Sequence, residues 1–152
     1  MTTISFFVPG TPVQQGSKRH VGNGIMVEAA PNLMPWRDSV IYAARSAMSK
    51  LGDAGQFPLD CPVRCEVTFR TPMPKSLPKA ERDRVWRPKT TAPDLDKLTR
   101  AIGDALEQSG MIRSDARIWS WDVSKVQTQA VPGANVIVSW GDEAARQGRV
   151  GP

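Results

Sequence analysis

Residues 63–69 read VRCEVTF, in which apolar and polar side chains alternate without interruption. A period of two is the pattern of a β-strand that buries one face and leaves the other open. Shorter alternating stretches at residues 4–8, 119–123 and 135–140 predict further strands. Residues 132–134, Pro-Gly-Ala, lie before the last of these and predict a hairpin turn between the last two strands. The chain is therefore expected to build a small sheet with one buried face.

Two segments have helical spacing instead. In residues 36–51 apolar side chains recur every three or four positions, and Gly52 follows as a stop. Residues 95–108 carry a second apolar stripe, which Gly110 ends. A long, basic, proline-rich connection at residues 71–93 precedes this second helix. The order of elements predicts a mixed α/β (α+β) fold, in which two main helices pack against one small mixed β-sheet.

The chain of 152 residues is expected to form one domain over residues 1–141, followed by a flexible C-terminal tail at residues 142–152. No stretch approaches the roughly 18 apolar residues of a membrane span, and the N-terminus lacks the basic region of a secretion signal. A cytoplasmic protein is therefore expected. Cys61 and Cys65, with a single histidine, are too few for a structural zinc site, so both are expected to be free thiols.

The net charge of +5 and the pI of about 9.6 suit a polyanionic partner such as DNA. The cations gather near residues 18–20 and in the connection at residues 71–93. Trp86 lies between Arg84 and Arg87, where its ring either stacks on an unpaired base or packs the connection onto the domain. The residues expected to contact DNA are Lys18, Arg19, Lys75, Lys79, Arg84, Trp86, Arg87, Lys89 and Lys97.

The sharpest local feature is the pair Asp94 and Asp96 at the start of the second helix. One interpretation is structural, because Asp94 can cap the helix and Asp96 can interact with the helix dipole. The other is catalytic, because carboxylates are the hard ligands that Mg²⁺ or Mn²⁺ needs for phosphodiester hydrolysis. Arg100 follows Asp96 by one helical turn on the same face, where it can steady a carboxylate or contact a phosphate. Asp115, taken alone, is an ordinary turn aspartate.

Taken together, these motifs resemble the RusA family of Holliday-junction resolvases. The specific stretches are PDLDKL at residues 93–98, RAIGDAL at 100–106, GMI at 110–112 and DARI at 115–118, and the similarity extends over residues 4–140. The resemblance implies a homodimer that binds four-way DNA junctions and makes paired nicks with Mg²⁺ or Mn²⁺. It also implies a role in DNA recombination and repair, in a bacterium or a phage-infected host.

By this resemblance Asp94, Asp96 and Asp115 match the three catalytic aspartates of the family and are its expected metal ligands. Arg100 stands where the family usually has a lysine. Arginine keeps the charge but presents a planar fork and does not lose its proton, so contact with the scissile phosphate is its expected role. Ser114 replaces an acidic residue that is common before the third aspartate, a departure that could weaken a second metal site.

The spacing of the three aspartates raises a question of reach. A helix over residues 95–108 would be roughly 21 Å long at 1.5 Å per residue. The seven residues from 109 to 115 span at most about 23 Å when fully extended. Asp115 could therefore barely return to Asp94 within one chain. Either the helix is shorter, or the acidic site is composite across the homodimer.

Two rival functions remain open. One is a less selective nuclease that acts on flaps or other branched DNA. The other is a non-catalytic DNA-binding protein of the same fold, in which the aspartates only cap. The presence of aspartate at all three positions argues against the second, because DNA binding alone favours the loss of negative charge. The residues do not separate the first rival from a junction resolvase.

Overall fold

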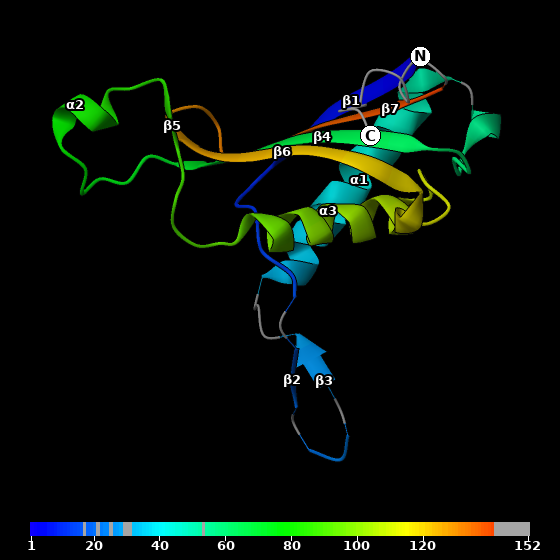
Figure 1. The fold of residues 1–152 in the computed structure, drawn as a ribbon, viewed down its shortest axis with the longest axis horizontal. Coiled ribbons are helices and arrows are strands. Elements are labelled where there is room, and N and C mark those ends of the chain that lie inside the picture. Colours follow the sequence, from blue (N-terminus) through cyan, green and yellow to red (C-terminus); the bar gives the residue numbers. More distant parts are fainter. Residues whose placement is uncertain (17, 21, 25, 29–31, 53, 142–152) are drawn as a thin grey trace, which may run out of the picture.

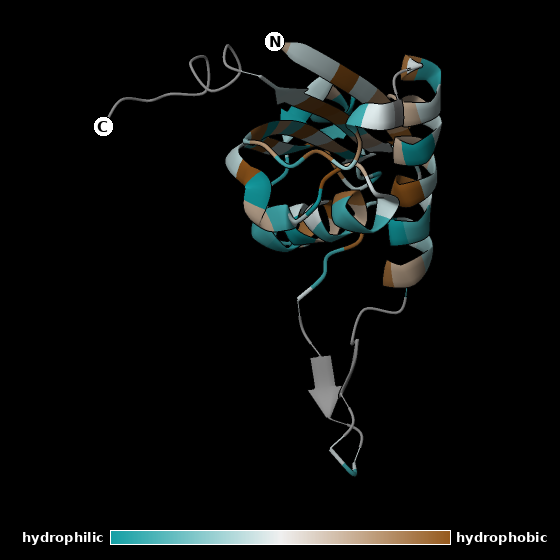
Figure 2. Ribbon diagram, turned by 90° about the vertical axis from the view of Figure 1, so that its right-hand side faces the viewer, coloured by the Kyte–Doolittle hydropathy of each residue, from teal (hydrophilic) through white to brown (hydrophobic). Residues whose placement is uncertain are grey.

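The computed structural model describes residues 1–16, 18–20, 22–24, 26–28, 32–52 and 54–141, and for residues 18–20, 26–28 and 54 it describes the backbone only. Two long helices lie on one side of a β-sheet, so the described chain forms two layers (Figures 1 and 2). This arrangement confirms the predicted α+β fold with a small mixed sheet. The predicted tail at residues 142–152 lies outside the described residues.

The main sheet has five strands in the order β1-β7-β4-β6-β5. The central strand β4 pairs antiparallel with β7 and parallel with β6, which makes the sheet mixed. The short strand β5 was not predicted, because its three residues include a proline and show no alternation. The strands are β1 (Thr2–Pro9), β4 (Val63–Pro72), β5 (Trp86–Pro88), β6 (Ile118–Thr128) and β7 (Gly133–Trp140).

The predicted hairpin between the last two strands is wrong. In the sheet β4 lies between β6 and β7, so the connection after Thr128 crosses the end of β4 to reach β7. The physical reason is the burial of β4, whose apolar side chains at every second position need neighbours on both sides. Gly133 serves close packing instead of a turn, because a β-carbon there would lie 2.1 Å from the carbonyl oxygen of Val8.

The two main helices, α1 (Leu33–Leu51) and α3 (Leu95–Ser109), cover the same face of the sheet (Figure 1). Gly52 and Gly110 follow them with φ of 79° and 85°, the left-handed conformation that ends a helix, which confirms both predicted stops. Each fully buried Leu, Ile or Val of the core contributes about 1.5–3 kcal/mol by leaving water. The core residues from the helices are Leu33, Trp36, Val40, Ala44, Leu98, Ala101, Ile102, Ala105 and Leu106.

The remaining elements are short. A two-stranded sheet of β2 (Lys18–His20) and β3 (Met26–Glu28) projects from the body of the molecule (Figure 1). The long connection contains the short helix α2 (Lys79–Arg82). The 3-10 turns η1 (Ala54–Gln56) and η2 (Asp115–Arg117) complete the fold. No helix among the described residues is long and apolar enough to span a membrane.

Both cysteines are free thiols, as expected from their number. Cys65 is buried in β4, where burial raises the pKa of its thiol to about 12. Cys61 is half-buried beside the core, and burial followed by the charge of Asp60 raises its pKa as well. Neither thiol is therefore an activated nucleophile.

Candidate active site

Polar side chains follow one face of α3. Asp96, Arg100, Asp104 and Glu107 recur at intervals of three or four residues, opposite the stripe that α3 buries in the core. Asp96 and Arg100 are both exposed and lie one turn apart, which confirms the predicted shared face. The buried stripe anchors the helix, so the polar face is held on a rigid element.

Asp94 occupies the N-cap position of α3 with an extended backbone, at φ −71° and ψ 136°. Its side chain nevertheless makes no capping hydrogen bond. The carboxylate is 59% exposed, and its neighbour is the ammonium of Lys97, with Nζ 3.6 Å from Oδ2. An ion pair this exposed contributes little to stability. The capping interpretation therefore does not account for Asp94, whose carboxylate remains available to a ligand.

The backbone around Asp94 is held from two sides. The side-chain oxygen Oε1 of Gln14 accepts a hydrogen bond of 2.9 Å from the backbone N–H of Asp94. From the sheet, Nζ of Lys125 on β6 donates to the carbonyl oxygens of Thr91 at 2.8 Å and Pro93 at 2.7 Å. Sequence reasoning missed Gln14 and Lys125, because each is far from Asp94 along the chain and carries no local signal.

The segment that leads to β2 also docks on α3. The backbone N–H of Gln15 donates to the carbonyl oxygen of Lys97 at 3.0 Å, and its side-chain Nε2 donates to Oδ2 of Asp104. Gly16 lies so close to α3 that an added β-carbon would be 3.3 Å from Nη1 of Arg100. The segment docked on α3 therefore leads along the chain to Lys18 and Arg19, two of the residues predicted to contact DNA. The side chains of these two residues lie outside the described part of the chain.

Asp115 begins the 3-10 turn η2 beside the middle of α3. Its backbone N–H donates to Oε1 of Glu107 at 2.9 Å. A β-carbon added at Gly103 would lie 3.8 Å from Cβ of Asp115. Asp96 precedes Gly103 by seven residues, which is about 10 Å along the helix axis at 1.5 Å per residue. Asp115 thus lies on the same side of α3 as Asp96 but about two turns away.

The three predicted aspartates do not converge within one chain. In the part of the chain that the structure describes, no three His, Cys, Asp or Glu side chains are placed to hold a metal ion together. The possibility of a shorter helix is wrong, because α3 extends over 15 residues, Leu95–Ser109. A single chain therefore does not fit the expected three-carboxylate site. An acidic site that is composite across a homodimer stays a prediction.

The family model described as endodeoxyribonuclease RusA matches residues 9–139. This chain belongs to the endodeoxyribonuclease RusA family. The match includes α3, Asp94, Asp96, Arg100 and Asp115, so the family resemblance and the acidic face coincide. No curated protein matches the chain.

The RusA-family match also covers a projecting segment that we call the basic arm, residues 73–93. Figure 1 shows this arm, with α2 and β5, extending past the ends of β4 and β6 and away from α1. Lys75, Lys79 and Arg84 are exposed, whereas Arg87 and Lys89 are half-buried. Partial burial and the nearby Lys125 lower the pKa of Lys89. The arm therefore carries exposed cations in a segment that leads along the chain to Asp94.

Trp86 lies on the surface of the basic arm. Its side chain is 53% exposed at the start of β5, so much of its ring is open to a base, and stacking stays a prediction. The tryptophans of β6 and β7 differ from one another: Trp140 is buried, Trp121 is half-buried and Trp119 is 42% exposed. Trp86, the aromatic residue of the basic arm, is thus more exposed than these three tryptophans.

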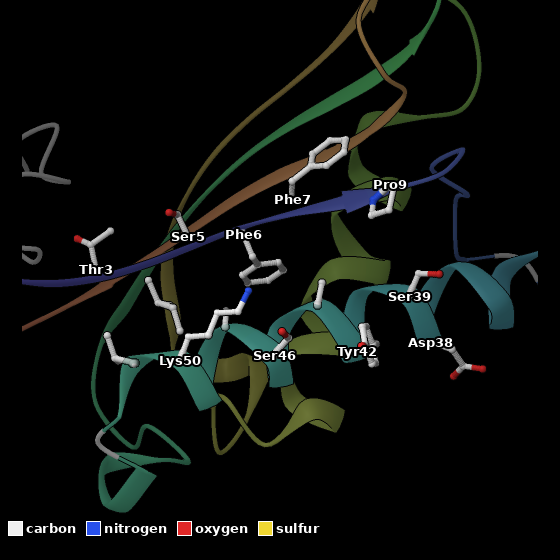
Figure 3. Close-up of a pocket in the computed structure, with 14 residues that line it drawn as sticks. Thr3, Ser5, Phe6, Phe7, Pro9, Asp38, Ser39, Tyr42, Ser46 and Lys50 are labelled. Atoms are coloured by element: carbon white, nitrogen blue, oxygen red, sulfur yellow. The ribbon is translucent and has the colours of Figure 1, made fainter.

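A groove of about 780 Å³ lies on the other side of the molecule, between β1 and α1 (Figure 3). Phe6, Tyr42 and Lys50 are among its lining residues. None of the predicted site residues lines this groove. In this RusA-family chain Asp94, Asp96 and Arg100 are instead exposed, which suits a large polymer better than a small enclosed substrate.

Proposed function

We propose that this chain is a metal-dependent, structure-specific endodeoxyribonuclease that resolves Holliday junctions by paired phosphodiester hydrolysis. The proposal rests on the carboxylate of Asp94 in a RusA-family chain. This carboxylate makes no capping hydrogen bond and is exposed at the start of α3, beside Asp96 and Arg100. An exposed acidic pair of this kind has a chemical use in a nuclease and little structural use here. The same proposal assigns the enzyme to DNA recombination and repair, in the cytoplasm of a bacterium or phage-infected host.

The proposed cofactor is Mg²⁺ or Mn²⁺, because both ions prefer the carboxylate oxygens that this face offers. When bound, such an ion supplies an activated water and neutralises charge on the phosphate. Since one chain does not bring three carboxylates together, we assign the third ligand to the partner subunit's Asp115. Asp94 and Asp96 would then act in each subunit with that partner residue.

Arg100 has a separate role in this proposal. Arginine presents a planar fork of donors that suits phosphate oxygens, so Arg100 binds the scissile phosphate. Lys97, whose Nζ lies 3.6 Å from Asp94, neutralises the next phosphate. Cations of the basic arm, among them Lys75, Lys79 and Arg84, contact the DNA backbone further away. Each such contact adds about −0.9 to the slope of log affinity against log salt for duplex DNA.

The proposed assembly is a homodimer. Paired nicks on opposite strands of a four-way junction require two active sites related by a two-fold axis. Two copies of this small domain supply both sites with one gene product. A composite acidic site gives the dimer a second purpose, because neither subunit would be active alone.

A labelled four-way junction and a matched linear duplex test the function directly, each with Mg²⁺, Mn²⁺ or EDTA. We expect paired nicks in the junction only, and only with a metal ion. Equal cleavage of both substrates would show a less selective nuclease. Binding without cleavage in every ion would show a non-catalytic DNA-binding protein.

Mixed dimers test the composite site. A dimer of one Asp94→Asn subunit and one Asp115→Asn subunit retains one intact composite site, so it should nick one strand. If each subunit instead contains a complete site of its own, both sites are damaged and the mixed dimer should be as inactive as either homodimer. A dimer of wild-type and Asp94→Asn subunits is the control for subunit exchange.

A further inference from the structure

Two consecutive residues of the basic arm expose large apolar side chains. Val85 is 81% exposed and Trp86 is 53% exposed. Single exposed apolar residues are ordinary, but this pair lies between Arg84 and Arg87, within a strongly cationic segment. A ligand that suits the whole surface must therefore offer both apolar area and negative charge.

The pair is held firmly by the end of β6. Trp86 is in register with Thr128, whose Oγ1 donates a hydrogen bond of 2.9 Å to the carbonyl oxygen of Val85. Next to it, Nε2 of Gln129 donates to the carbonyl oxygen of Arg82 at 2.5 Å. The two side chains are thus presented outward on a backbone that the sheet fixes. Such preorganisation lowers the entropy lost when a ligand binds.

The position of Trp86 relative to the acidic face is set by β6. Thr128, its partner in register, follows Lys125 by three residues, which is about 10 Å along a strand. Lys125 in turn donates to the carbonyl oxygen of Pro93, directly before Asp94. The end of β6 therefore holds both the backbone at Trp86 and the segment directly before Asp94.

DNA offers a ligand of the required chemistry at a branch point. Base pairs inside a continuous duplex are stacked on both faces, whereas the pair at a branch exposes an apolar face beside charged phosphates. Aromatic side chains stack on such a face with any base, so recognition depends on the structure of the DNA and not on its sequence.

We propose that Val85 and Trp86 form a wedge that stacks on the base pair at the branch point and sets its distance from the cleaved phosphate. This inference rests on the proposed nuclease function and deepens it, because it names what selects branched DNA over linear duplex. Arg84 and Arg87, which lie 3.3 Å and 3.6 Å from Oε2 of Glu81, exchange this partner for the phosphates on either side of the stacked base pair.

The experiment compares Trp86→Ala with wild type on a four-way junction of fixed branch position that carries 2-aminopurine at the branch. Trp119→Ala is the matched control, because Trp119 is also a partly exposed tryptophan, at 42%, at the opposite end of β6. Fluorescence is read in EDTA, where no cleavage takes place. Cut positions are then mapped at nucleotide resolution with Mg²⁺. Thermal unfolding of each variant checks that it folds.

We expect Trp86→Ala to lose the 2-aminopurine response. The ratio of its affinity for the junction to its affinity for linear duplex should fall about tenfold. Its cuts should spread over neighbouring phosphates. Trp86→Phe should keep most of both properties, and Trp119→Ala should behave as wild type. An unchanged fluorescence response and unchanged cut positions in Trp86→Ala would overturn the wedge. If wild type does not nick junctions but the fluorescence response depends on Trp86, the wedge stands and the proposed nuclease function fails.

Discussion

The basic arm directly precedes α3 in the chain, but the two segments are fixed to the domain by different contacts. One face of α3 is buried in the core, where Leu98, Ile102 and Leu106 are inaccessible to solvent. In the basic arm, all of whose residues are described, none is fully buried, and hydrogen bonds from β6 hold its backbone. The acidic groups are thus placed on a helix anchored by apolar burial, and the cations on an exposed arm anchored by hydrogen bonds to β6. This division suits a nuclease, because the arm leaves its cations accessible to DNA while the core holds the acidic groups in place.

The largest effect is expected at the acidic face. Asp96→Asn keeps the size of the side chain but removes its charge, so it should lower junction nicking about a hundredfold or more, since metal ligation contributes several kcal/mol. Junction affinity in EDTA should change by less than about twofold, because the substitution leaves the cationic contacts of the arm in place. Asp38→Asn, at an exposed aspartate on α1, is the control. Loss of binding together with unfolding would instead assign Asp96 a structural role at the helix start.

Stability separates the two regions next. Leu98→Ala removes a side chain with 0% exposure and should lower the free energy of unfolding by about 2–5 kcal/mol. Leu77→Ala, at a half-buried leucine of the basic arm, should cost less than about 1 kcal/mol. Urea denaturation measures both. Similar losses at the two positions would mean that the arm is as much a part of the cooperative core as α3.

Lys125 links the two regions, since it lies on β6 and holds the carbonyl groups that precede Asp94. Lys125→Met removes two charge-assisted hydrogen bonds and should lower the rate of nicking about tenfold, if misplacement of Asp94 costs about 1.4 kcal/mol. Junction affinity should fall less than about threefold. Lys125→Arg should restore part of the rate, because arginine can donate to the same carbonyl groups.

The control for Lys125 is Lys75→Met, which removes an exposed cation of the arm. It should weaken binding slightly and leave the rate on bound junction unchanged. If Lys125→Met changes only affinity, in the same way as Lys75→Met, Lys125 is a phosphate contact and not a positioning residue.

The smallest effect is expected at Gly103, where α3 meets Asp115. A β-carbon at this position would lie 3.6 Å from Cζ2 of Trp121 and 3.8 Å from Cβ of Asp115, which are ordinary contact distances. Gly103→Ala should therefore raise the free energy of unfolding by up to about 1 kcal/mol through helix propensity, with unchanged nicking. Gly103→Leu should displace Asp115 and lower nicking. Destabilisation by alanine would show that the packing here is tighter than the distances indicate.

Local patterns in the sequence predicted most of the secondary structure and part of the site. The alternation at residues 63–69, the stripe of α3 and the two stop glycines each appear where the local pattern placed them. The shared face of Asp96 and Arg100 was also predictable, because the helical repeat places residues four apart on one side. Simple chain lengths also limit how far Asp115 can return, and in the structure it lies beside Gly103, about two turns of α3 from Asp96.

Contacts between distant segments were not predictable in this way. How whole elements pack decides the place of β4 between β6 and β7 and the exposure of Trp86. It also decides the hydrogen bonds from the backbone N–H of Asp94 to Gln14 and from Lys125 to the carbonyl oxygen of Pro93. By itself the sequence determined which segments are strands and helices, because periodic burial and backbone preferences act over a few residues. Only the tertiary structure decided which strands pair and which side chains meet, because those choices minimise the free energy of the whole core at once.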